Sequence, residues 1–296
     1  MRIRHSDRRA PGRRAVLLVC LPVLLAACLL RAPAAAASGA TVIGSSTRAM
    51  SPNRTTQSYG ARVEETALGN YVADAFRQAA GTDIAIECGG HLVKSLPGGD
   101  LTAADAAAVF DRDRMVVAVE LTAGQLFALL EHGVGTLDID EAEQLDPESG
   151  FDGFPQVSGF SFVYDVSQKP GRRVRSVTLD GGAALSAGET RTLTAALPAD
   201  MLDGSLGFSM LEGLPARPVG LQSELLSSLI AGQQEVSIPE TSRAVVLGTA
   251  EHTLFEALHA RFWLPYLILI ILVIRLPMQR HRARNADGSL SRRYRN

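Results

Sequence analysis

The sequence has few cysteines and histidines and lacks the short motifs of common enzymes. Only three of its 296 residues are cysteine, and two of them, Cys20 and Cys28, lie in an apolar N-terminal run. Cys88 is therefore alone in the body of the chain, which excludes an internal disulfide there. There is no G-x-S-x-G, P-loop, C-x-x-C or dinucleotide-binding pattern, and none of the six histidines falls in a metal-ligand motif. We therefore assign no catalytic residue, metal or cofactor.

Basic residues are also scarce between the two ends of the chain. From Ser38 to Phe255 there are 14 Lys and Arg against 28 Asp and Glu, so this part carries a net charge of 14 − 28 = −14. Such a surface repels polyanions, so nucleic acid is not an expected partner.

The N-terminus has the pattern of an export signal. Six arginines precede an apolar run from Ala15 to Leu30, and the small residues of RAPAAAASGA follow it. This order predicts a signal peptide over residues 1–37 with an A-x-A cleavage site near Ala35 to Ala37. Leu25-Ala26-Ala27-Cys28 also fits a lipoprotein signal, in which Cys28 would be lipidated.

The C-terminus predicts a single membrane span. The run FWLPYLILIILVI covers Phe262 to Ile274, and its extension to Met278 gives 17 residues, or about 25 Å of helix. Trp263 and Tyr266 suit one interface, and an arginine-rich tail follows. We predict a membrane-proximal and transmembrane helix over 251–278, a cytoplasmic tail over 279–296 and residues 38–250 outside the cell membrane. A buried core helix is the alternative.

Residues 38–250 read as one α+β domain, with helical and strand patterns interleaved and no repeat. Helices are expected at 65–80, 122–134 and 220–231, and strands at 84–86, 115–121, 157–165, 174–179, 192–197 and 243–248.

Four stretches resemble, in order and spacing, the C-terminal domain of bacterial 5'-nucleotidases. They are RVEETALGNYVADAFRQAAGTDIAI, VVAVELTAGQLFALLEHGV, GFPQVSGFSFVYD, and GFSMLEG with PETSRAVVLG, which together cover Thr41 to Gly248. The resemblance implies an α+β, mixed-sheet domain that recognises a nucleotide and presents it to a separate metallophosphatase domain. The sequence has none of that domain's Asp-x-His, Gly-Asn-His-Glu or Gly-His-x-His motifs, so we expect no hydrolysis by this chain alone.

The family's ligand motifs are altered here. Its substrate loop, Asn-x-Gly-Gly-Ile-Arg, aligns with Cys88 to Val93, so that Gly90 matches the first glycine and Val93 replaces the arginine. Its Pro-Phe-Gly-Asn motif aligns with Asp111 to Arg114, which puts Arg112 at the base-stacking phenylalanine. Its Gly-Gly-Asp-Gly-aromatic motif aligns with Gly204 to Phe208 and keeps the aromatic ring. The resemblance implies these ligand-binding candidates: Phe208, Arg112, Arg114, Cys88 and Gly90.

Three functions remain open. The first is a membrane-anchored, non-catalytic module that binds a nucleoside, a nucleotide or another protein. The second is the substrate-recognition half of a split 5'-nucleotidase that acts with a separate metallophosphatase chain. The third is altered chemistry, with Cys88 as nucleophile and His91 as its base.

Overall fold

The computed structural model describes residues 40–53 and 59–250. The chain divides into a unit that ends at Thr41 and a second unit from Val42, and the fold below is that of the second unit. The α-helices are α2 (Ala67–Ala80), α3 (Ala103–Ala108), α4 (Ala123–Gly133) and α5 (Gln222–Gln233). The 3-10 helices are η1 (Gly89–His91), η2 (Pro147–Ser149), η3 (Ala199–Asp203), η4 (Ser205–Gly207) and η5 (Ser209–Leu211). The strands are β1 (Val42–Ser46), β2 (Ile84–Cys88), β3 (Gly99–Thr102), β4 (Met115–Thr122), β5 (Pro155–Ser158), β6 (Phe160–Asp165), β7 (Val174–Leu179), β8 (Ala184–Leu185), β9 (Thr192–Pro198), β10 (Ala216–Leu221) and β11 (Ala244–Leu247).

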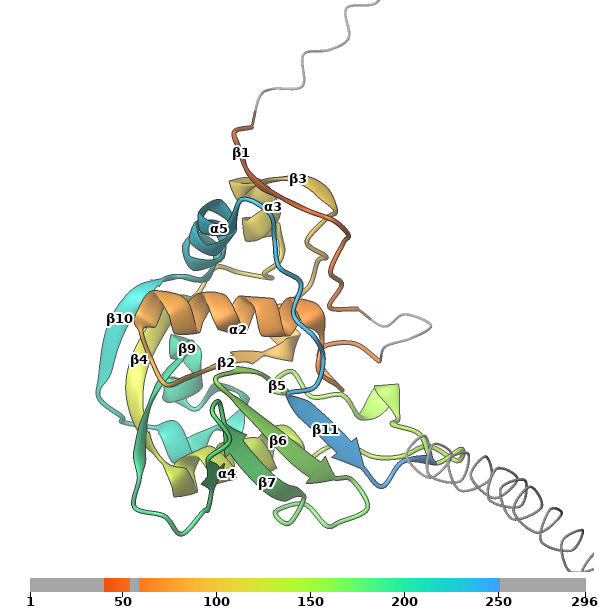
Figure 1. Ribbon diagram of the computed structural model, residues 1–296. Coiled ribbons are helices and arrows are strands. Elements are labelled where there is room, and N and C mark those ends of the chain that lie inside the picture. The colour runs from red at the N-terminus through yellow and green to blue at the C-terminus, as the bar shows by residue number, and fades with distance from the viewer. Residues whose placement is uncertain (1–39, 54–58, 251–296) are drawn as a thin grey trace, which may run out of the picture. The chain divides into compact units, whose positions relative to one another are not determined.

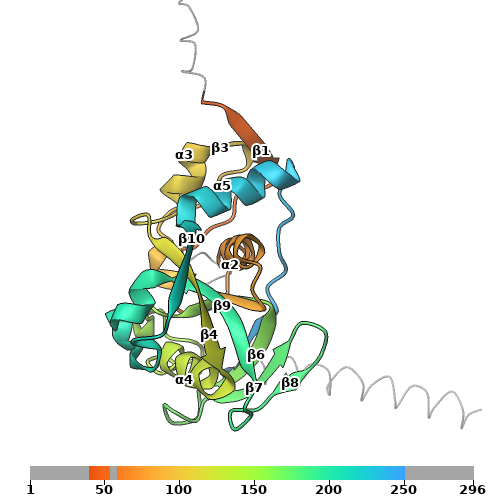
Figure 2. The same cartoon turned by 90° about the vertical axis from the view of Figure 1, so that its left-hand side faces the viewer.

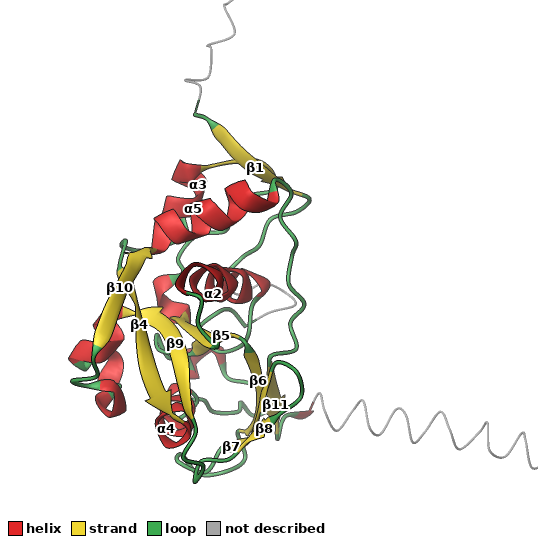
Figure 3. Cartoon of the chain, turned by 60° about the vertical axis from the view of Figure 1, so that its left-hand side comes forward, coloured by secondary structure: helices red, strands yellow, loops and turns green. Residues whose placement is uncertain are grey.

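A mixed five-stranded sheet in the order β10-β4-β9-β2-β5 forms the centre of the domain (Figure 1). Only the β2 and β9 pair is parallel, and the other neighbours are antiparallel. Helix α2 lies on one face of this sheet and α4 on the other, and α5 and α3 lie beyond α2 (Figures 2 and 3). The short pair β1 and β3 is antiparallel and lies beside α5.

Two hydrophobic clusters pack against the opposite faces of this sheet. One cluster joins the α4 side chains to alternate residues of β4, such as Val117 and Val119, and to side chains of β6 and β7. The other joins α2 and α5 to Val116 and Ala196. This alternation is the period of two that a strand imposes when both of its faces are covered.

Capping residues define where the main helices begin and end. Thr66 caps α2 by accepting a hydrogen bond from the amide of Gly69, and Gly81 ends the helix in the left-handed conformation. Helix α4 begins with a capping box between Thr122 and Gln125. These local signals explain why the sequence predicts both helices.

The sequence prediction of one strand over 157–165 is wrong at Gly159. This residue has a φ of +88°, and a Cβ there would lie 2.2 Å from the carbonyl oxygen of Asp83. The chain therefore turns at Gly159 and passes from β5, an edge strand of the five-stranded sheet, to β6 in a four-stranded sheet ordered β11-β6-β7-β8.

The segment that leads to β11 is held against the core by hydrogen bonds from charged side chains. Arg243 donates two hydrogen bonds to Asp74, at 2.7 and 2.9 Å, and one to the carbonyl of Val157. The Glu65 carboxylate accepts from the amides of Arg243 and Ala244. The domain therefore continues to the end of β11.

The α+β, mixed-sheet prediction is confirmed, and each expected helix and strand has a counterpart within a few residues. The sequence reading missed β1, β3, α3, β8 and β10. No helix among residues 40–53 and 59–250 is long and apolar enough to cross a membrane. The predicted signal (1–37), the transmembrane segment and the cytoplasmic tail lie outside the described residues.

Candidate functional site

A buried polar network occupies the end of β2, where the family's substrate loop begins. Glu87 is fully buried, and one of its carboxylate oxygens accepts a 2.6 Å hydrogen bond from the amide of Cys88 and lies 2.7 Å from Nδ1 of His91. Its other oxygen accepts a 2.5 Å hydrogen bond from Nε2 of Gln222, the first residue of α5. A buried carboxylate needs several hydrogen-bond donors to offset its loss of solvation, and Glu87 has them.

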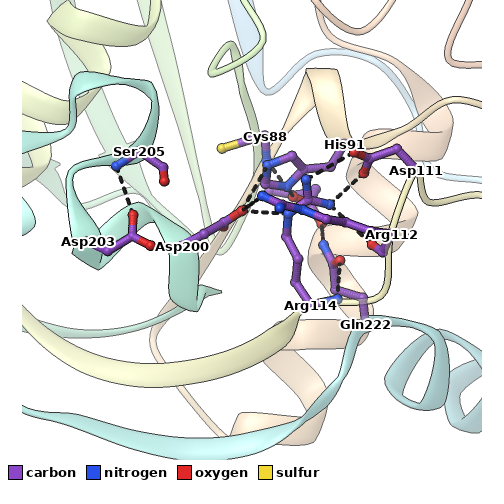
Figure 4. A network of polar contacts seen from close by, with 10 residues as sticks. Cys88, His91, Asp111, Arg112, Arg114, Asp200, Asp203, Ser205 and Gln222 are labelled. Atoms are coloured by element: carbon purple, nitrogen blue, oxygen red, sulfur yellow. Dashed lines mark hydrogen bonds and ion pairs between the residues drawn. The ribbon is translucent and has the colours of Figure 1, made fainter.

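The network continues to two further loops through Arg114. Gln222 Oε1 accepts from the amide of Arg114, and the Arg114 guanidinium donates to Oδ2 of Asp200 at 2.6 Å and to Oδ1 of Asp111 at 2.6 Å. Arg112 also donates to Oδ2 of Asp200, at 3.0 Å. The loops at 87–91, 111–114 and 198–203 are thus joined to one another and to α5 (Figure 4).

Burial and pairing act in opposite directions on the charged members. Burial alone would raise the pKa of Asp111, but the hydrogen bond and charge of Arg114 lower it overall. Burial would likewise lower the pKa of Arg114, but the hydrogen bonds to Asp111 and Asp200 raise it. Both groups therefore stay charged near neutral pH.

The candidates Arg112 and Arg114 lie together but differ in access. The Arg112 side chain is 65% exposed, whereas that of Arg114 is 9% exposed. Of these two arginines, Arg112 is therefore the one that a ligand from solvent can reach without a rearrangement.

The two glycines of the substrate loop face the chain itself. A Cβ on Gly89 would lie 1.7 Å from the carbonyl oxygen of Ala61, and one on Gly90 would lie 2.5 Å from the Cβ of Asp152. The amides of Gly89 and Gly90 donate to the carbonyls of Phe154 and Asp152. Both amides are therefore engaged, and the close approach that glycine permits is to neighbouring backbone.

Cys88 lies in the hydrophobic cluster on the α4 side of the sheet and is fully buried. Burial and the charges of Glu87 and Asp200 raise its thiol pKa well above the usual range. Because the thiolate is the nucleophile, this surrounding does not favour attack by Cys88 on a substrate.

Phe208 is also fully buried. Its ring packs edge-on against His132 with centroids 4.9 Å apart and lies 6.3 Å from the ring of Phe151. In the described part of the chain no cation-π contact joins Phe208 to Arg112. A ligand-binding role for Phe208, as one wall of a base clamp, stays a prediction.

Glu87, Cys88 and His91 form the one group of three potential metal ligands within the described residues. Their geometry favours the network over an ion. Glu87 and Cys88 are successive strand residues with side chains on opposite faces, and the Cys88 sulfur points away from the network (Figure 4). The Glu87 carboxylate already accepts from Gln222 and the Cys88 amide.

Three cavities in the described part of the domain lie elsewhere. A cavity of about 520 Å³ is lined by Tyr71, Arg77 and Arg243, among other residues. A second cavity, of about 400 Å³, is lined by Glu65 and Tyr164, among others. The largest of the three, about 750 Å³, lies over β4, β9 and β10 where α2 ends. None of these three is lined by the five candidate residues.

The sequence model of the family described as "5'-nucleotidase, C-terminal domain" matches residues 42–213. The chain belongs to this family. The 5'-nucleotidase precursor of Thermus thermophilus superposes with a TM-score of 0.60 at 23% identity, over 79% of this chain and 43% of that one. A putative 5'-nucleotidase from Staphylococcus aureus gives 0.58 at 16% identity, over 83% and 46%. These likenesses confirm the fold.

Two curated relatives are similar in sequence. The trifunctional nucleotide phosphoesterase protein YfkN of Bacillus subtilis (strain 168) is 32% identical over 123 residues, and an apyrase of Anopheles gambiae is 26% identical over 180. The matches cover 40% and 58% of this chain but only 8% and 30% of those proteins. The 5'-nucleotidase C-terminal domain is thus a part of much longer relatives.

The sequence reading missed Glu87, Asp200 and Gln222, and it considered His91 only as a base for Cys88. A signal for Glu87 was available, because matching both motif glycines to Gly89 and Gly90 shifts the alignment by one residue. Glu87 then stands at the motif's asparagine and Leu92 at its arginine, in place of Cys88 and Val93. The parts played by Asp200 and Gln222 required the fold, since they lie more than 100 residues beyond Glu87.

Proposed function

We propose that this chain is a membrane-anchored, extracytoplasmic 5'-nucleotidase C-terminal domain that does not hydrolyse nucleotides by itself and serves as a ligand-binding or interaction module. The observation that carries this proposal is the closed network of Glu87, Gln222, Arg114 and Asp200. By side-chain hydrogen bonds it joins two of the loops that align with the family's ligand motifs, at 87–91 and 111–114, to α5 and to the loop at 198–203. The absence of two-metal ligand motifs from the sequence supports the non-hydrolytic part.

Catalysis is tested with the purified full chain. We expect no release of phosphate from nucleoside monophosphates with Mg²⁺, Mn²⁺ or Zn²⁺ present. Turnover that survives repurification and disappears with a chelator would contradict the proposal. Turnover lost in a Cys88→Ala chain would instead support thiol chemistry.

A nucleoside or nucleotide is the ligand that family membership suggests. Arg112 can stack on a base from its exposed position, and its pairing with Asp200 leaves the guanidinium face available. The net negative domain disfavours phosphates, so adenosine should bind at least as well as its monophosphate. We expect weak binding in titration calorimetry, lost in Arg112→Ala and kept in the matched Arg48→Ala. Micromolar binding that persists in both Arg112→Ala and Phe208→Ala would place the ligand elsewhere.

The anchor rests on the apolar run from Phe262 to Ile274 and the arginines that follow it. Protease added to cells with a permeabilised outer envelope should remove the domain and spare a tag placed after Asn296. Digestion of that tag from outside would reverse the proposed orientation.

A second candidate function is the recognition half of a split 5'-nucleotidase. It is favoured by the length of the relatives, since this chain spans 43% and 46% of the two nucleotidase structures. The test adds a separately produced metallophosphatase chain from the same organism to this chain. Turnover that requires both chains and depends on Arg112 would support the split enzyme.

A further inference from the structure

The turn between β6 and β7 is a basic site on an acidic domain. Residues 166–179 contain no Asp or Glu, although Ser38 to Phe255 carries a net charge of 14 − 28 = −14. Lys169, Arg172 and Arg175 are exposed on this hairpin, and none of them makes an ion pair with the described part of the chain. We call these three residues the basic turn.

The basic turn has a fixed geometry. The amide of Gln168 donates to the carbonyl of Asp165, that of Arg172 donates to Lys169, and Gly171 has a φ of +83°. A fourth cation, Arg173, is turned inward and donates to the carbonyls of Val134 and Leu137, at 2.6 Å each. Arg173 therefore holds the hairpin against the domain, and the three residues of the basic turn face outward.

Acidic groups lie near the basic turn and reduce its field. Hydrogen bonds from Ser167 lower the pKa of Asp165, so this carboxylate stays charged, and it faces the charge of Arg175. Glu131 and Asp138 lie beside Arg173, and Asp138 is exposed. With Arg173 included, four cations are opposed by three carboxylates, so the hairpin and its neighbours keep a net charge of about 4 − 3 = +1.

The basic turn lies where the chain leaves the domain. Strand β11 runs parallel to β6, with Leu247 opposite Asp165. The amide of Val166 donates to the carbonyl of Leu247, and a Cβ on Gly248 would lie 3.0 Å from the amide of Ser167. Figure 1 shows the β6 and β7 hairpin beside β11, the last described strand.

Chain length limits how far this exit lies from a membrane. Eleven residues lie between Ala250 and Phe262, the start of the apolar run, so Ala250 and Phe262 are at most about 40 Å apart even when the chain is fully extended. If the apolar run is the anchor, the face that carries the end of β11 and the basic turn is therefore the face nearest the lipid.

We propose that Lys169, Arg172 and Arg175 bind the headgroups of anionic phospholipids and so orient the domain on the outer face of the membrane. The inference rests on the anchor put forward as part of the proposed function. Each cation near an anionic surface strengthens binding about fivefold, so a net of one predicts about a fivefold preference for anionic over neutral lipid. The acidic loop around Glu143 also lies near the exit, since Glu143 accepts from the amide of Ala250, and it is repelled by the same surface. The domain therefore tilts with the hairpin toward the lipid.

The test uses the full chain in lipid nanodiscs with a fluorophore on Ser176→Cys, an exposed position of β7. Cys20 and Cys28 are replaced by serine, and Cys88 is buried. Quenching by headgroup spin labels is measured in discs of neutral phosphatidylcholine and in discs with about 30% phosphatidylglycerol. We expect several-fold stronger contact in the anionic discs, seen as stronger quenching, and loss of this difference at high salt.

The charge variant is Lys169→Gln, Arg172→Gln and Arg175→Gln in one chain. It should lose the preference for anionic discs, with a fall of about fivefold or more in the contact equilibrium. Circular dichroism that matches the wild type would show that the loss is not unfolding.

The matched control is Arg48→Gln, Lys94→Gln and Arg217→Gln, which removes the same charge from exposed positions elsewhere. It should keep the quenching. Equal quenching in neutral and anionic discs, or equal losses in the two triple variants, would overturn the proposal. Displacement by millimolar glycerol phosphate would also overturn it, in favour of a soluble phosphate site.

Failure of the anchor can be distinguished from failure of this inference. If alkaline carbonate extracts the chain from membranes, the proposed anchor is refuted. Flotation with phosphatidylglycerol vesicles would then test the basic turn directly. Binding that only the Lys169, Arg172 and Arg175 variant loses would support the inference, and no binding would overturn it.

Discussion

The pairing of Arg114 with Asp200 provides the sharpest test of whether the network holds the loop at 111–114 to the loop at 198–203. Arg114→Met removes the guanidinium and leaves the Asp200 carboxylate, 16% exposed, with Arg112 as its remaining charged donor. Loss of one partner from a buried pair costs about 3–5 kcal/mol, and partial exposure and Arg112 reduce this to about 2–3 kcal/mol. Asp111 is 41% exposed and adds little.

The Asp200→Asn change is smaller, because Arg114 keeps its hydrogen bonds to Asp111. We expect a loss of about 1–2 kcal/mol. The double variant leaves neither charge unmatched at the pair, so its loss should be well below the sum. A coupling energy of about 1–2 kcal/mol is therefore expected.

The measurement is urea unfolding of the full chain in mild detergent, followed by circular dichroism, for the wild type, the two single variants and the double variant. A matched cycle on Arg62 and Asp152, whose side chains are 58% and 52% exposed, should give a coupling below about 0.5 kcal/mol. If the Arg114 and Asp200 losses simply add, the network does not join the loops.

Three further outcomes are expected. Gly159→Ala should destabilise the domain by more than about 2 kcal/mol in urea unfolding, because it combines strain at φ +88° with a 2.2 Å contact. The control Gly181→Ala, at φ +90° in open space, should lose only about 1 kcal/mol of stability. Equal losses would contradict the role of Gly159. Cys88 should resist iodoacetamide in the folded chain and react fully in urea, as read by mass spectrometry of its peptide; fast labelling of the folded chain would show an accessible thiol. Because the pKa of Asp111 is lowered in the folded state, this carboxyl stabilises the fold above the unfolded pKa of about 4, and its contribution is lost as the pH falls through the folded pKa. In Asp111→Asn, the free energy of unfolding measured from about pH 6 to 2 should therefore depend less steeply on pH below about 4. An unchanged slope would contradict the assigned pairing.

The parts of the fold that the sequence predicts are those with local causes. Helix α2 follows from its capping Thr66, its apolar spacing and Gly81, all within one short stretch. The break between β5 and β6 was missed because a glycine inside an alternating run looks like part of a strand. Its cause is the carbonyl of Asp83, more than 70 residues earlier in the chain. Strands β1 and β10 were missed because their pairing partners are also distant.

The candidate site shows the same division. Alignment with the family's motifs identified the loops at 88–93 and 111–114, and the structure brings the second of these to the end of β2. Motif alignment could not predict that Arg114 would pair with Asp200, because that contact joins segments 86 residues apart. It also kept Phe208 as a ligand wall, although packing on His132 encloses the ring. Side-chain contacts between loops depend on the whole topology, and residue type alone does not encode them.

The composition of the network argues that these loops have adapted to one another. In the register that matches both glycines, Glu87 replaces the neutral asparagine of the family's substrate loop. A buried carboxylate without partners would cost several kcal/mol, so this substitution is tolerable only beside donors such as Gln222 and His91. A nucleotide that recruited Glu87 would have to break at least two charge-assisted hydrogen bonds of about 1.5–3 kcal/mol each. That loss of about 3–6 kcal/mol compares with about 8 kcal/mol for the whole of a micromolar interaction. Tight binding that recruits Glu87 is therefore disfavoured while the network is intact, and we expect a ligand or partner of this domain to contact its exposed residues instead.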